Sequence, residues 1–478
     1  MAAPGRFRAH KAAITLLLAI VSTTTAKYSG GTGEPNAPYQ IATAEDLLAL
    51  GDEPNDYDKH FILTQDIDLD PNLPDGRVFD KAVVAPTVYL ASPKGSLYPS
   101  GVCFSGTFDG RDHRISHLTI NGDSFLGLFG RLAPEANITS LRVMDVNITG
   151  SGYHVGGLVG YVDRGNITGC CATGSTRGNH QVGGLVGANE SGTLNACYAT
   201  GPADGNVFVG GLVGYNHGTI TSCYSTGSVS GATHVGGLSG YTVQGSVTHC
   251  YATGSVSASQ WNVGGLVGSS FGSSLTACYS TGSVTGSFNL GGLVGFNESD
   301  STVSACFWDI EASGQTVSAA GTGKTTAEMQ RQNTFTDARW DFVRETKNGT
   351  EDIWWINEGK GYPRLWWERQ PVIELDSTNF DAQIAHGVIL VDFFATWCPH
   401  CTTQAPIVEE VAERVKGRAL VAKLDVDQSR AIAQRYGVSA IPTLILFQDG
   451  VQVRRFVGVT AADVLVSAIL AAVESSGQ

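Results

Sequence analysis

Residues 388–401 read VILVDFFATWCPHC, an apolar run that ends in two cysteines separated by two residues. The run 388–394 predicts a buried strand, and the segment that opens at Cys398 predicts a helix to about Val415. Two cysteines in this position can reach each other, and the first lies where backbone N–H groups and the helix dipole stabilise a thiolate. The stretch therefore predicts a thiol–disulfide exchange site.

A Cys-x-x-Cys pair can also be half of a zinc site. Zinc takes four ligands, so two further ligands, usually cysteines or histidines, would be needed. No cysteine or histidine follows Cys401, and the nearby imidazoles are His386 and His400. We therefore expect no metal at the pair and no cofactor beyond the two cysteines.

The residues around the pair predict an alternation of strands and helices that closes in a hairpin and a helix. The Asp449-Gly450 dipeptide is a hairpin signal, and Thr460 is expected to be the N-cap of the last helix. Besides the strand and helix above, we expect strands over 372–375, 419–425, 443–448 and 451–457, and helices over 377–384 and 430–436. The segment 370–478 has the size of one domain.

This segment resembles the thioredoxin family over roughly Pro371 to Ser475. Val391 to Cys398 looks like the family's active-site strand, Val421 to Asp427 like its central strand, and Tyr436 to Leu444 like the segment that carries its cis-proline. The resemblance implies an α/β thioredoxin fold and a protein-disulfide oxidoreductase. It also implies cysteine-containing protein substrates and an unidentified protein that donates or accepts electrons.

The resemblance gives the catalytic roles to four residues. Cys398 would be the attacking thiolate, and Cys401 would resolve the mixed disulfide. Asp392 would be a buried carboxyl with a raised pKa that handles the proton of Cys401, and Lys423 would lie near it and temper that rise. The alternatives are a solvated acid at a strand end for Asp392, which its apolar surroundings disfavour, and a surface lysine for Lys423.

Five further residues are expected to tune the site or bind the substrate. Trp397 would pack beside the pair, and Pro442 would be cis and face the sulfurs, with the backbone at Ile441 pairing with an extended substrate. Pro399-His400 departs from the Gly-Pro of reducing thioredoxins and resembles the bacterial periplasmic disulfide oxidases. A histidine there stabilises the Cys398 thiolate and makes the disulfide a stronger oxidant. The direction of electron flow stays open, with a more oxidising pair favoured.

The N-terminus predicts export. A basic stretch with Arg6, Arg8 and Lys11 precedes the apolar run 12–21 and the small residues of 24–26. The run is too short for a membrane-spanning helix of ~20 residues. We expect a cleaved signal peptide over 1–26, no transmembrane segment, and an exported protein in the periplasm, at the cell surface or outside the cell; an uncleaved anchor is the alternative.

Glycine is abundant and periodic in the middle of the chain. The 478 residues include 60 glycines but only 30 lysines and arginines, and the net charge of −14 argues against nucleic-acid binding. The phrase Gly-Gly-Leu-Val-Gly begins at 156 and returns, once with serine for valine, at spacings of 27, 27, 26, 28 and 27 residues. Such a unit cannot bury its own core, so we expect a Gly-rich parallel β-solenoid with about one repeat per coil.

These phrases resemble the GLUG repeat of bacterial surface and secreted proteins. Residues 104–110 and 125–130 look like divergent first coils, and 306–367 contains the aromatic segment that would cover the last coil. The predicted organisation is a cap with the first coils over 27–150, GLUG-type repeats over 151–310, a capping segment and linker over 311–369, and the thioredoxin-like domain over 370–478. The chain is thus expected to be multidomain.

Six cysteines recur at one position of the repeat. Coils stacked ~4.8 Å apart would bring neighbouring cysteines within the Cα range of a disulfide. In-register side chains point in parallel, however, which favours a column of buried thiols over three bridges. The six are Cys170, Cys197, Cys223, Cys250, Cys278 and Cys306.

Two functions follow from the sequence. The first is an exported thiol–disulfide oxidoreductase tethered to a β-solenoid scaffold. The second is a surface adhesion or binding solenoid that carries an accessory redox domain.

Overall fold

The computed structural model describes residues 27–92, 96–343, 345, 347–368, 372–416 and 418–476. The predicted signal peptide over 1–26 lies outside these residues. Among the described residues, no helix combines the length and apolar character needed to cross a membrane. The chain forms two compact units; the second takes 276–278, 304–312 and the chain from 322 onward, and the first takes the rest up to 321.

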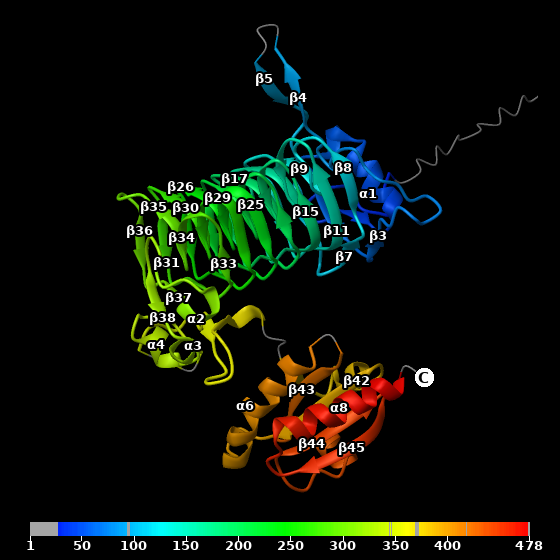
Figure 1. The fold of residues 1–478 in the computed structure, drawn as a ribbon. Coiled ribbons are helices and arrows are strands. Elements are labelled where there is room, and N and C mark those ends of the chain that lie inside the picture. Colours follow the sequence, from blue (N-terminus) through cyan, green and yellow to red (C-terminus); the bar gives the residue numbers. More distant parts are fainter. Residues whose placement is uncertain are drawn as a thin grey trace, which may run out of the picture. The chain divides into compact units, whose positions relative to one another are not determined.

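The glycine-rich repeats form a parallel β-solenoid, which confirms the fold expected from their period (Figure 1). Equivalent residues of neighbouring coils pair in register: Val159 pairs with Val186, and Val186 with Val213. The steps of 27 residues equal the sequence period, so each repeat makes one coil.

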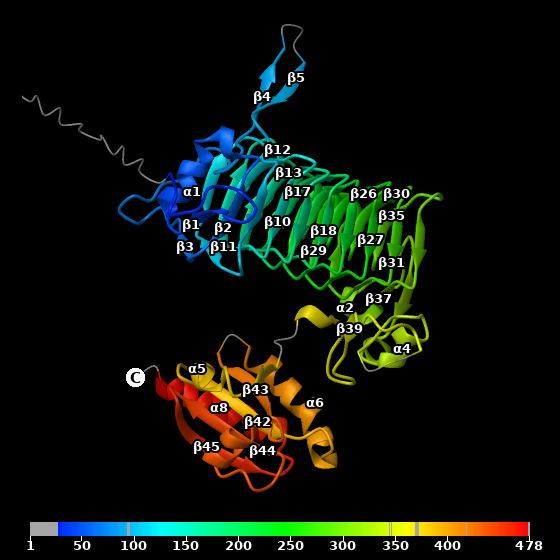
Figure 2. The ribbon, with the colours of Figure 1, turned by 180° about the vertical axis from the view of Figure 1, so that it is seen from behind.

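The first sheet of the solenoid contains ten strands and is seen in Figure 2. Its strands are short, with an apolar central residue that points into the coil, as at Ile167 and Leu194. In order they are β1 (Tyr39–Ile41), β2 (His60–Leu63), β6 (Thr107–Asp109), β10 (Asn137–Thr139), β14 (Asn166–Thr168), β18 (Thr193–Asn195), β23 (Thr219–Thr221), β27 (Ser246–Thr248), β31 (Ser274–Thr276) and β36 (Thr302–Ser304).

The second sheet contains seven strands, each of which begins at the fourth residue of the glycine phrase or its equivalent. They are β9 (Phe129–Leu132), β13 (Val159–Asp163), β17 (Val186–Glu190), β22 (Val213–Asn216), β26 (Ser239–Val243), β30 (Val267–Phe271) and β35 (Val294–Asn297).

The remaining strands of the coils lie on a third side, to which most coils contribute two or three segments. They are β3 (Ile67–Asp68), β7 (Arg114–Ser116), β8 (Thr119–Gly122), β11 (Arg142–Gly150), β12 (Tyr153–Val155), β15 (Cys171–Arg177), β16 (His180–Gly183), β19 (Tyr198–Ala199), β20 (Ala203–Asp204), β21 (Val207–Gly210), β24 (Tyr224–Ser225), β25 (Val229–Gly236), β28 (Tyr251–Ala252), β29 (Val256–Gly264), β32 (Tyr279–Ser280), β33 (Val284–Thr285), β34 (Phe288–Gly291), β37 (Phe307–Asp309) and β38 (Thr322–Lys324).

Identical positions of successive coils stack inside and outside the solenoid. Leu185, Leu212 and Leu238 are fully buried at one such position. The six periodic cysteines are buried free thiols in this structure, as expected for in-register side chains that point in parallel. Burial raises the pKa of the Cys170 thiol to about 12, so this thiol stays protonated and behaves as a small apolar side chain.

The second glycine of the phrase is required by the close approach of neighbouring coils. A Cβ on Gly184 would lie 2.3 Å from the Gly211 carbonyl oxygen, and one on Gly211 would lie 2.2 Å from that of Gly237. Any larger residue would push the coils apart, so the glycine period follows from the coil spacing.

Several smaller elements accompany the coils. A hairpin of β4 (Val88–Ala91) and β5 (Leu97–Ser100) extends from the first coils (Figure 1). In the second unit, Phe307 packs against Phe335 and Trp340, so aromatic residues cover this last part of the coils. The other elements are α1 (Ala44–Gly51), α2 (Ile310–Ser313), α3 (Thr326–Met329), α4 (Gln332–Thr336), the 3₁₀ turns Pro54–Asp56 and Trp366–Glu368, and the pair β39 (Trp354–Trp355) and β40 (Arg364–Leu365).

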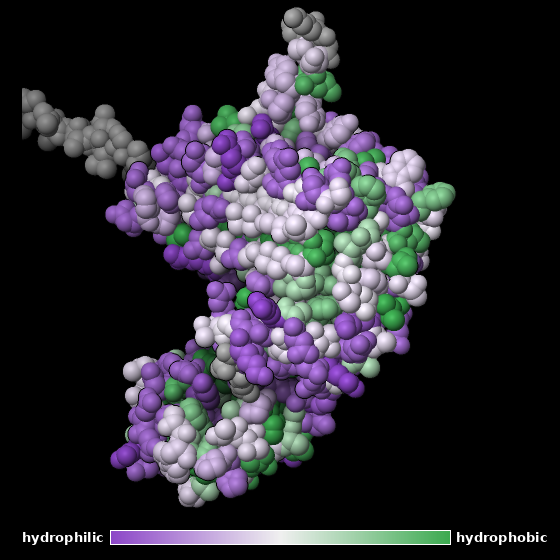
Figure 3. All heavy atoms as spheres, turned by 90° about the vertical axis from the view of Figure 1, so that its left-hand side faces the viewer, coloured by the Kyte–Doolittle hydropathy of each residue, from purple (hydrophilic) through white to green (hydrophobic). Residues whose placement is uncertain are grey.

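Figure 3 shows one face of the molecule, on which hydrophobic side chains are dispersed among hydrophilic ones. The large apolar side chains exposed on the later coils include Trp261, Phe288 and Phe296. Aromatic side chains are therefore accessible on the surface of the solenoid.

The C-terminal domain has a five-stranded mixed sheet in the order β41-β43-β42-β44-β45, in which β44 and β45 are antiparallel to their neighbours. This α/β arrangement confirms the predicted fold. Its elements are β41 (Ile373–Leu375), α5 (Phe380–Ile384), β42 (Val388–Phe394), α6 (Pro399–Arg414), β43 (Leu420–Asp425), α7 (Arg430–Arg435), β44 (Thr443–Gln448), β45 (Val451–Val457) and α8 (Ala462–Ser476).

Helices cover both faces of this sheet. One core packs α6 and α8 against Leu390 and Leu444, and the other packs α5 and α7 against Val391 and Ile445. Side chains of β42 therefore alternate between the two cores, as the pleat of a strand requires. Leu390 and Asp392 lie on the side that α6 covers.

The prediction that Thr460 caps the last helix was wrong. Helix α8 begins two residues later, at Ala462. The Thr460 hydroxyl donates to the Gly458 carbonyl oxygen, and its N–H donates to the Gln404 side chain of α6. The tertiary contact with Gln404 thus holds Thr460 in the segment before the helix.

Candidate functional site: a cysteine pair above a buried carboxyl

The two cysteines lie at the N-terminus of α6. Cys398 is the N-cap residue, with extended backbone, and Pro399 occupies the first helical position, where a missing N–H costs nothing. The Cys401 N–H lies 3.1 Å from Cys398 Sγ. A backbone donor and the helix dipole thus both face the sulfur of Cys398, which stabilises a negative charge there.

Cys398 and Cys401 are joined by a disulfide, with their Cα atoms 5.3 Å apart. Each residue is only 4% exposed. Together with Ala395 they form a small buried cluster on which the partly buried Phe394 and Ile441 pack. The pair therefore lies in apolar surroundings next to the surface.

The loop before β44 reaches the same sulfur. The Ile441–Pro442 peptide bond is cis. The Ile441 carbonyl oxygen lies 3.8 Å from Cys398 Sγ, so the backbone before Pro442 borders the disulfide at Cys398. This is where the sequence placed a backbone segment for an extended substrate.

Asp392 is buried in β42 on the face that α6 covers. It is 4% exposed, and within the described part of the chain its Oδ1 accepts no hydrogen bond. Burial raises the pKa of the Asp392 carboxyl to about 7, while the positive charge of Lys423 acts in the opposite direction. A carboxyl with this pKa holds or releases a proton near neutral pH.

Lys423 pairs in register with Asp392 on the neighbouring strand β43. Its ammonium group nevertheless binds the Glu374 carboxylate at 2.8 Å and lies 5.8 Å from the centre of the Phe394 ring. Lys423 is thus both a half-exposed lysine with its own ion pair and a source of positive charge for Asp392.

The remaining predicted residues lie on the surface around the pair. Trp397 is 68% exposed and donates its indole N–H to Asp427 at 2.7 Å. Pro399 and His400 are exposed on the first turn of α6. Trp397 is therefore held beside the site by a hydrogen bond at the rim and not by burial.

Sequence reasoning missed two acidic partners, Asp427 of Trp397 and Glu374 of Lys423. Asp427 stands two residues beyond the end of a central strand, a position that often carries functional side chains and could have drawn attention. Glu374 shows no comparable signal, because its role depends on the pairing of β41 with β43.

No group of histidine, cysteine and acidic side chains suited to a metal ion occurs among the described residues. With the two sulfurs already bonded to each other, the chemistry that the site offers is exchange of this disulfide with thiols.

Comparison with known proteins finds two families in the chain. The thioredoxin family model matches residues 371–471, and the GLUG motif matches 151–176, 178–204, 205–230, 231–257 and 259–285. The thioredoxin of Staphylococcus aureus (strain Mu50 / ATCC 700699) is 45% identical over 87 residues, which are 18% of this chain and 84% of the relative.

Two solved structures are also similar to this part of the chain. A point mutant of the thioredoxin from Halobacterium salinarum NRC-1 is 38% identical, and the thioredoxin of Malassezia sympodialis is 30% identical. Each match covers 22% of this chain and 93% of the other, with a TM-score of 0.21.

Proposed function

Because this chain belongs to the thioredoxin family through residues 371–471, we propose that it is an exported thiol–disulfide oxidoreductase that acts on cysteine-containing proteins. The family likeness supports a thiol–disulfide oxidoreductase kind of activity for that domain. The solenoid is the scaffold from which the domain works. The observation that carries the proposal is the Cys398–Cys401 disulfide at the start of α6, next to the buried carboxyl of Asp392.

Oxidation of a substrate begins at Cys398. A substrate thiolate attacks Cys398 Sγ, the bond between the two cysteines breaks, and a mixed disulfide joins the substrate to Cys398. The sulfur of Cys401 leaves with the electron pair and takes a proton, which a neutral Asp392 can supply at a pH near its pKa of about 7.

The second half of the reaction returns Cys398 as a thiolate. A second substrate thiolate attacks the substrate sulfur of the mixed disulfide, the new substrate disulfide forms, and Cys398 leaves. The substrate loses two electrons and the cysteine pair gains them. The pair must then pass these electrons to a partner disulfide or another oxidant; the same steps in reverse reduce a substrate.

The side chain of His400 supports an oxidising direction. It lies in the first turn of α6, where a histidine can stabilise the Cys398 thiolate by charge or by donating a hydrogen bond, in addition to the helix dipole and the Cys401 N–H. Each of these favours the thiolate and hence the reduced pair, which makes the disulfide a better oxidant.

Export is supported by the basic and apolar N-terminal sequence, and an oxidising pair suits an oxidising compartment. This part of the proposal rests on the sequence of residues 1–26 alone.

The decisive test is oxidation of a reduced, unfolded protein such as ribonuclease A. We expect the Cys398→Ser variant to lose all turnover, because no other sulfur in the domain can accept the first attack. Cys103→Ser, which removes a free thiol of the first coils, should retain wild-type turnover. Exchange activity that survives Cys398→Ser would refute the proposed function.

A further inference from the structure

A shallow polar groove of about 570 Å³ runs across five consecutive coils of the solenoid, at the corner where the second sheet passes into the first. Its lining includes Thr219, Ser246 and Ser274 from the start of three strands of the first sheet, and His217, Gln244 and Asp300 from the preceding turns. Each of the five coils contributes residues from this corner, so the groove follows the solenoid axis.

The hydroxyls form a row along one wall. Thr219 pairs with Ser246 in register, and their side-chain oxygens lie 3.2 Å apart. Parallel strands are spaced ~4.8 Å apart. The wall therefore offers a hydroxyl group from each of these successive coils.

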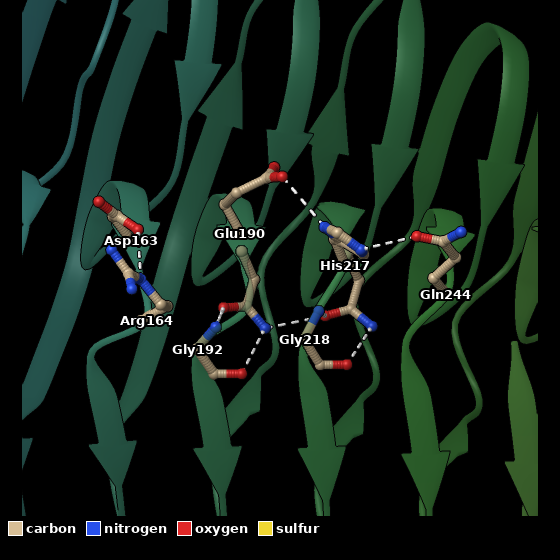
Figure 4. A network of polar contacts seen from close by, with 9 residues as sticks. Asp163, Arg164, Glu190, Gly192, His217, Gly218 and Gln244 are labelled. Carbon is tan, nitrogen blue, oxygen red and sulfur yellow. Dashed lines mark hydrogen bonds and ion pairs between the residues drawn. The ribbon is translucent and has the colours of Figure 1, made fainter. Parts of the chain in front are cut away.

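The planar polar side chains are held in place before any ligand arrives. His217 contacts Glu190 at 3.0 Å through Nδ1 and Gln244 at 3.2 Å through Nε2, so three coils are linked in one line (Figure 4). Within the described residues, the other end of the Gln244 amide makes no hydrogen bond. This end is available to a molecule in the groove.

Gly272 leaves space at the bottom of the groove between Gln244 and Asp300. Gly272 has a φ of +56°, and its N–H donates to Asp300 Oδ1 at 2.9 Å. A Cβ here would lie 3.2 Å from Asp300 Oδ2 and 3.5 Å from the Gln244 side chain. A larger residue would be strained and would fill the space between the two polar groups.

An aromatic row borders the groove on the second sheet. The rings of Tyr215, Tyr241, Phe271 and Phe296 follow one another with centroids 5.8, 5.2 and 5.4 Å apart, and all four are partly or well exposed. The backbone N–H of Gln244 donates to the Phe271 carbonyl oxygen at 2.7 Å, so the end of this strand lies next to the turn that carries Gln244.

The geometry points to a binding site for a neutral, linear polysaccharide that lies along the solenoid axis. Hydroxyl, amide and carboxylate groups along the groove bind sugar hydroxyls, while the exposed edges of the stacked rings beside it can contact sugar C–H groups. Glu190 and Asp300 line or border the groove, and the whole chain carries a charge of −14, which disfavours acidic polymers. The regular coil spacing matches a repeating ligand better than a compact one.

The test is affinity electrophoresis of the full-length protein through gels that contain hydroxyethylcellulose, galactomannan or laminarin. We expect at least one of these neutral polymers to retard the protein, while polygalacturonate does not. Retardation by none of the three neutral polymers, or equally by polygalacturonate, would overturn the inference.

A pair of variants locates the site. Gln244→Ala should weaken binding about three- to tenfold, as expected for the loss of one hydrogen bond. Gln260→Ala removes the same exposed side chain from β29, outside the groove, and should bind like the wild type. Equal binding by the two variants, with unchanged circular dichroism spectra, would place any polysaccharide elsewhere.

Discussion

The raised pKa of the Asp392 carboxyl results from its surroundings. The residue sits in a run of otherwise apolar side chains, and the sheet turns it toward the core beneath α6. No hydrogen bond to Oδ1 from the described residues compensates the loss of water, so the neutral form is favoured. The nearby charge of Lys423 only partly opposes this effect, because that lysine also binds Glu374.

A pH-dependent stability follows from this raised pKa. The folded protein retains a proton on Asp392 up to about pH 7, whereas the unfolded chain releases it near the ordinary aspartate pKa of 3.8. The free energy of unfolding should therefore fall as pH rises from about 4 through 7, by at most about 4 kcal/mol from this group. Asp392→Asn should lack this fall when the unfolding of the C-terminal domain is followed between pH 5 and 9.

The control for this prediction is Asp463→Asn, which removes an exposed carboxylate with 86% of its side chain accessible. It should keep the wild-type pH dependence. If Asp392→Asn loses as much stability as the wild type on going from pH 5 to 9, Asp392 does not hold the proton.

The first turn of α6 is the element that sets the character of the cysteine pair. It places Cys398 at the N-cap, Pro399 at the first helical position and the Cys401 N–H toward the Cys398 sulfur. His400, in contrast, acts on the pair through an exposed side chain. Its effect on the pair can thus be measured without disturbing the helix.

We expect His400→Pro to lower the reduction potential of the pair, because the reduced form loses a histidine side chain that favours the Cys398 thiolate by charge or hydrogen bonding. A tenfold loss in thiolate stabilisation corresponds to about 30 mV. Equilibration of the full-length protein with glutathione buffers measures the potential. The exposed His386, which lies outside α6, gives the matched control His386→Ala. A potential that is equal in wild type and His400→Pro would remove the support for an oxidising pair.

At the scale of the whole molecule, the coils depend on their neighbours. Neighbouring coils pair in register, and columns of buried leucine, cysteine and glycine run through the glycine-rich repeats. Stability of such a stack is a sum over coils and their contacts. We therefore expect that a whole coil can be deleted without loss of the fold, whereas part of a coil cannot.

Deletion of residues 184–210 removes one full period and joins Gly183 to Gly211, which restores the glycine phrase. We expect this variant to fold, with a small decrease in Tm. Deletion of 184–197 removes about half a coil, turns core residues outward and should prevent folding of the solenoid. Circular dichroism and thermal unfolding compare the two; equal loss of structure would contradict the stacking of independent coils.

Much of this organisation could be predicted because it depends on residues that are close together in the sequence. The spacing of the glycine phrase gave the coil length, and the apolar run before Cys398 gave β42. The strands Thr443–Gln448 and Val451–Val457 have the predicted bounds because Asp449-Gly450 marks the turn between them. The start of α8 and the partners Glu374 and Asp427 were not predicted, since each depends on a residue that is distant in the chain.

The sequence by itself determined the repeat, the order of strands and helices, and the reactive pair, because each rests on short-range spacing. Only the tertiary structure decided that the six periodic cysteines are buried thiols, that Asp392 has a pKa of about 7, and that a polar groove runs beside an aromatic row. These properties arise from burial and from neighbours brought together by folding, and no local pattern specifies them.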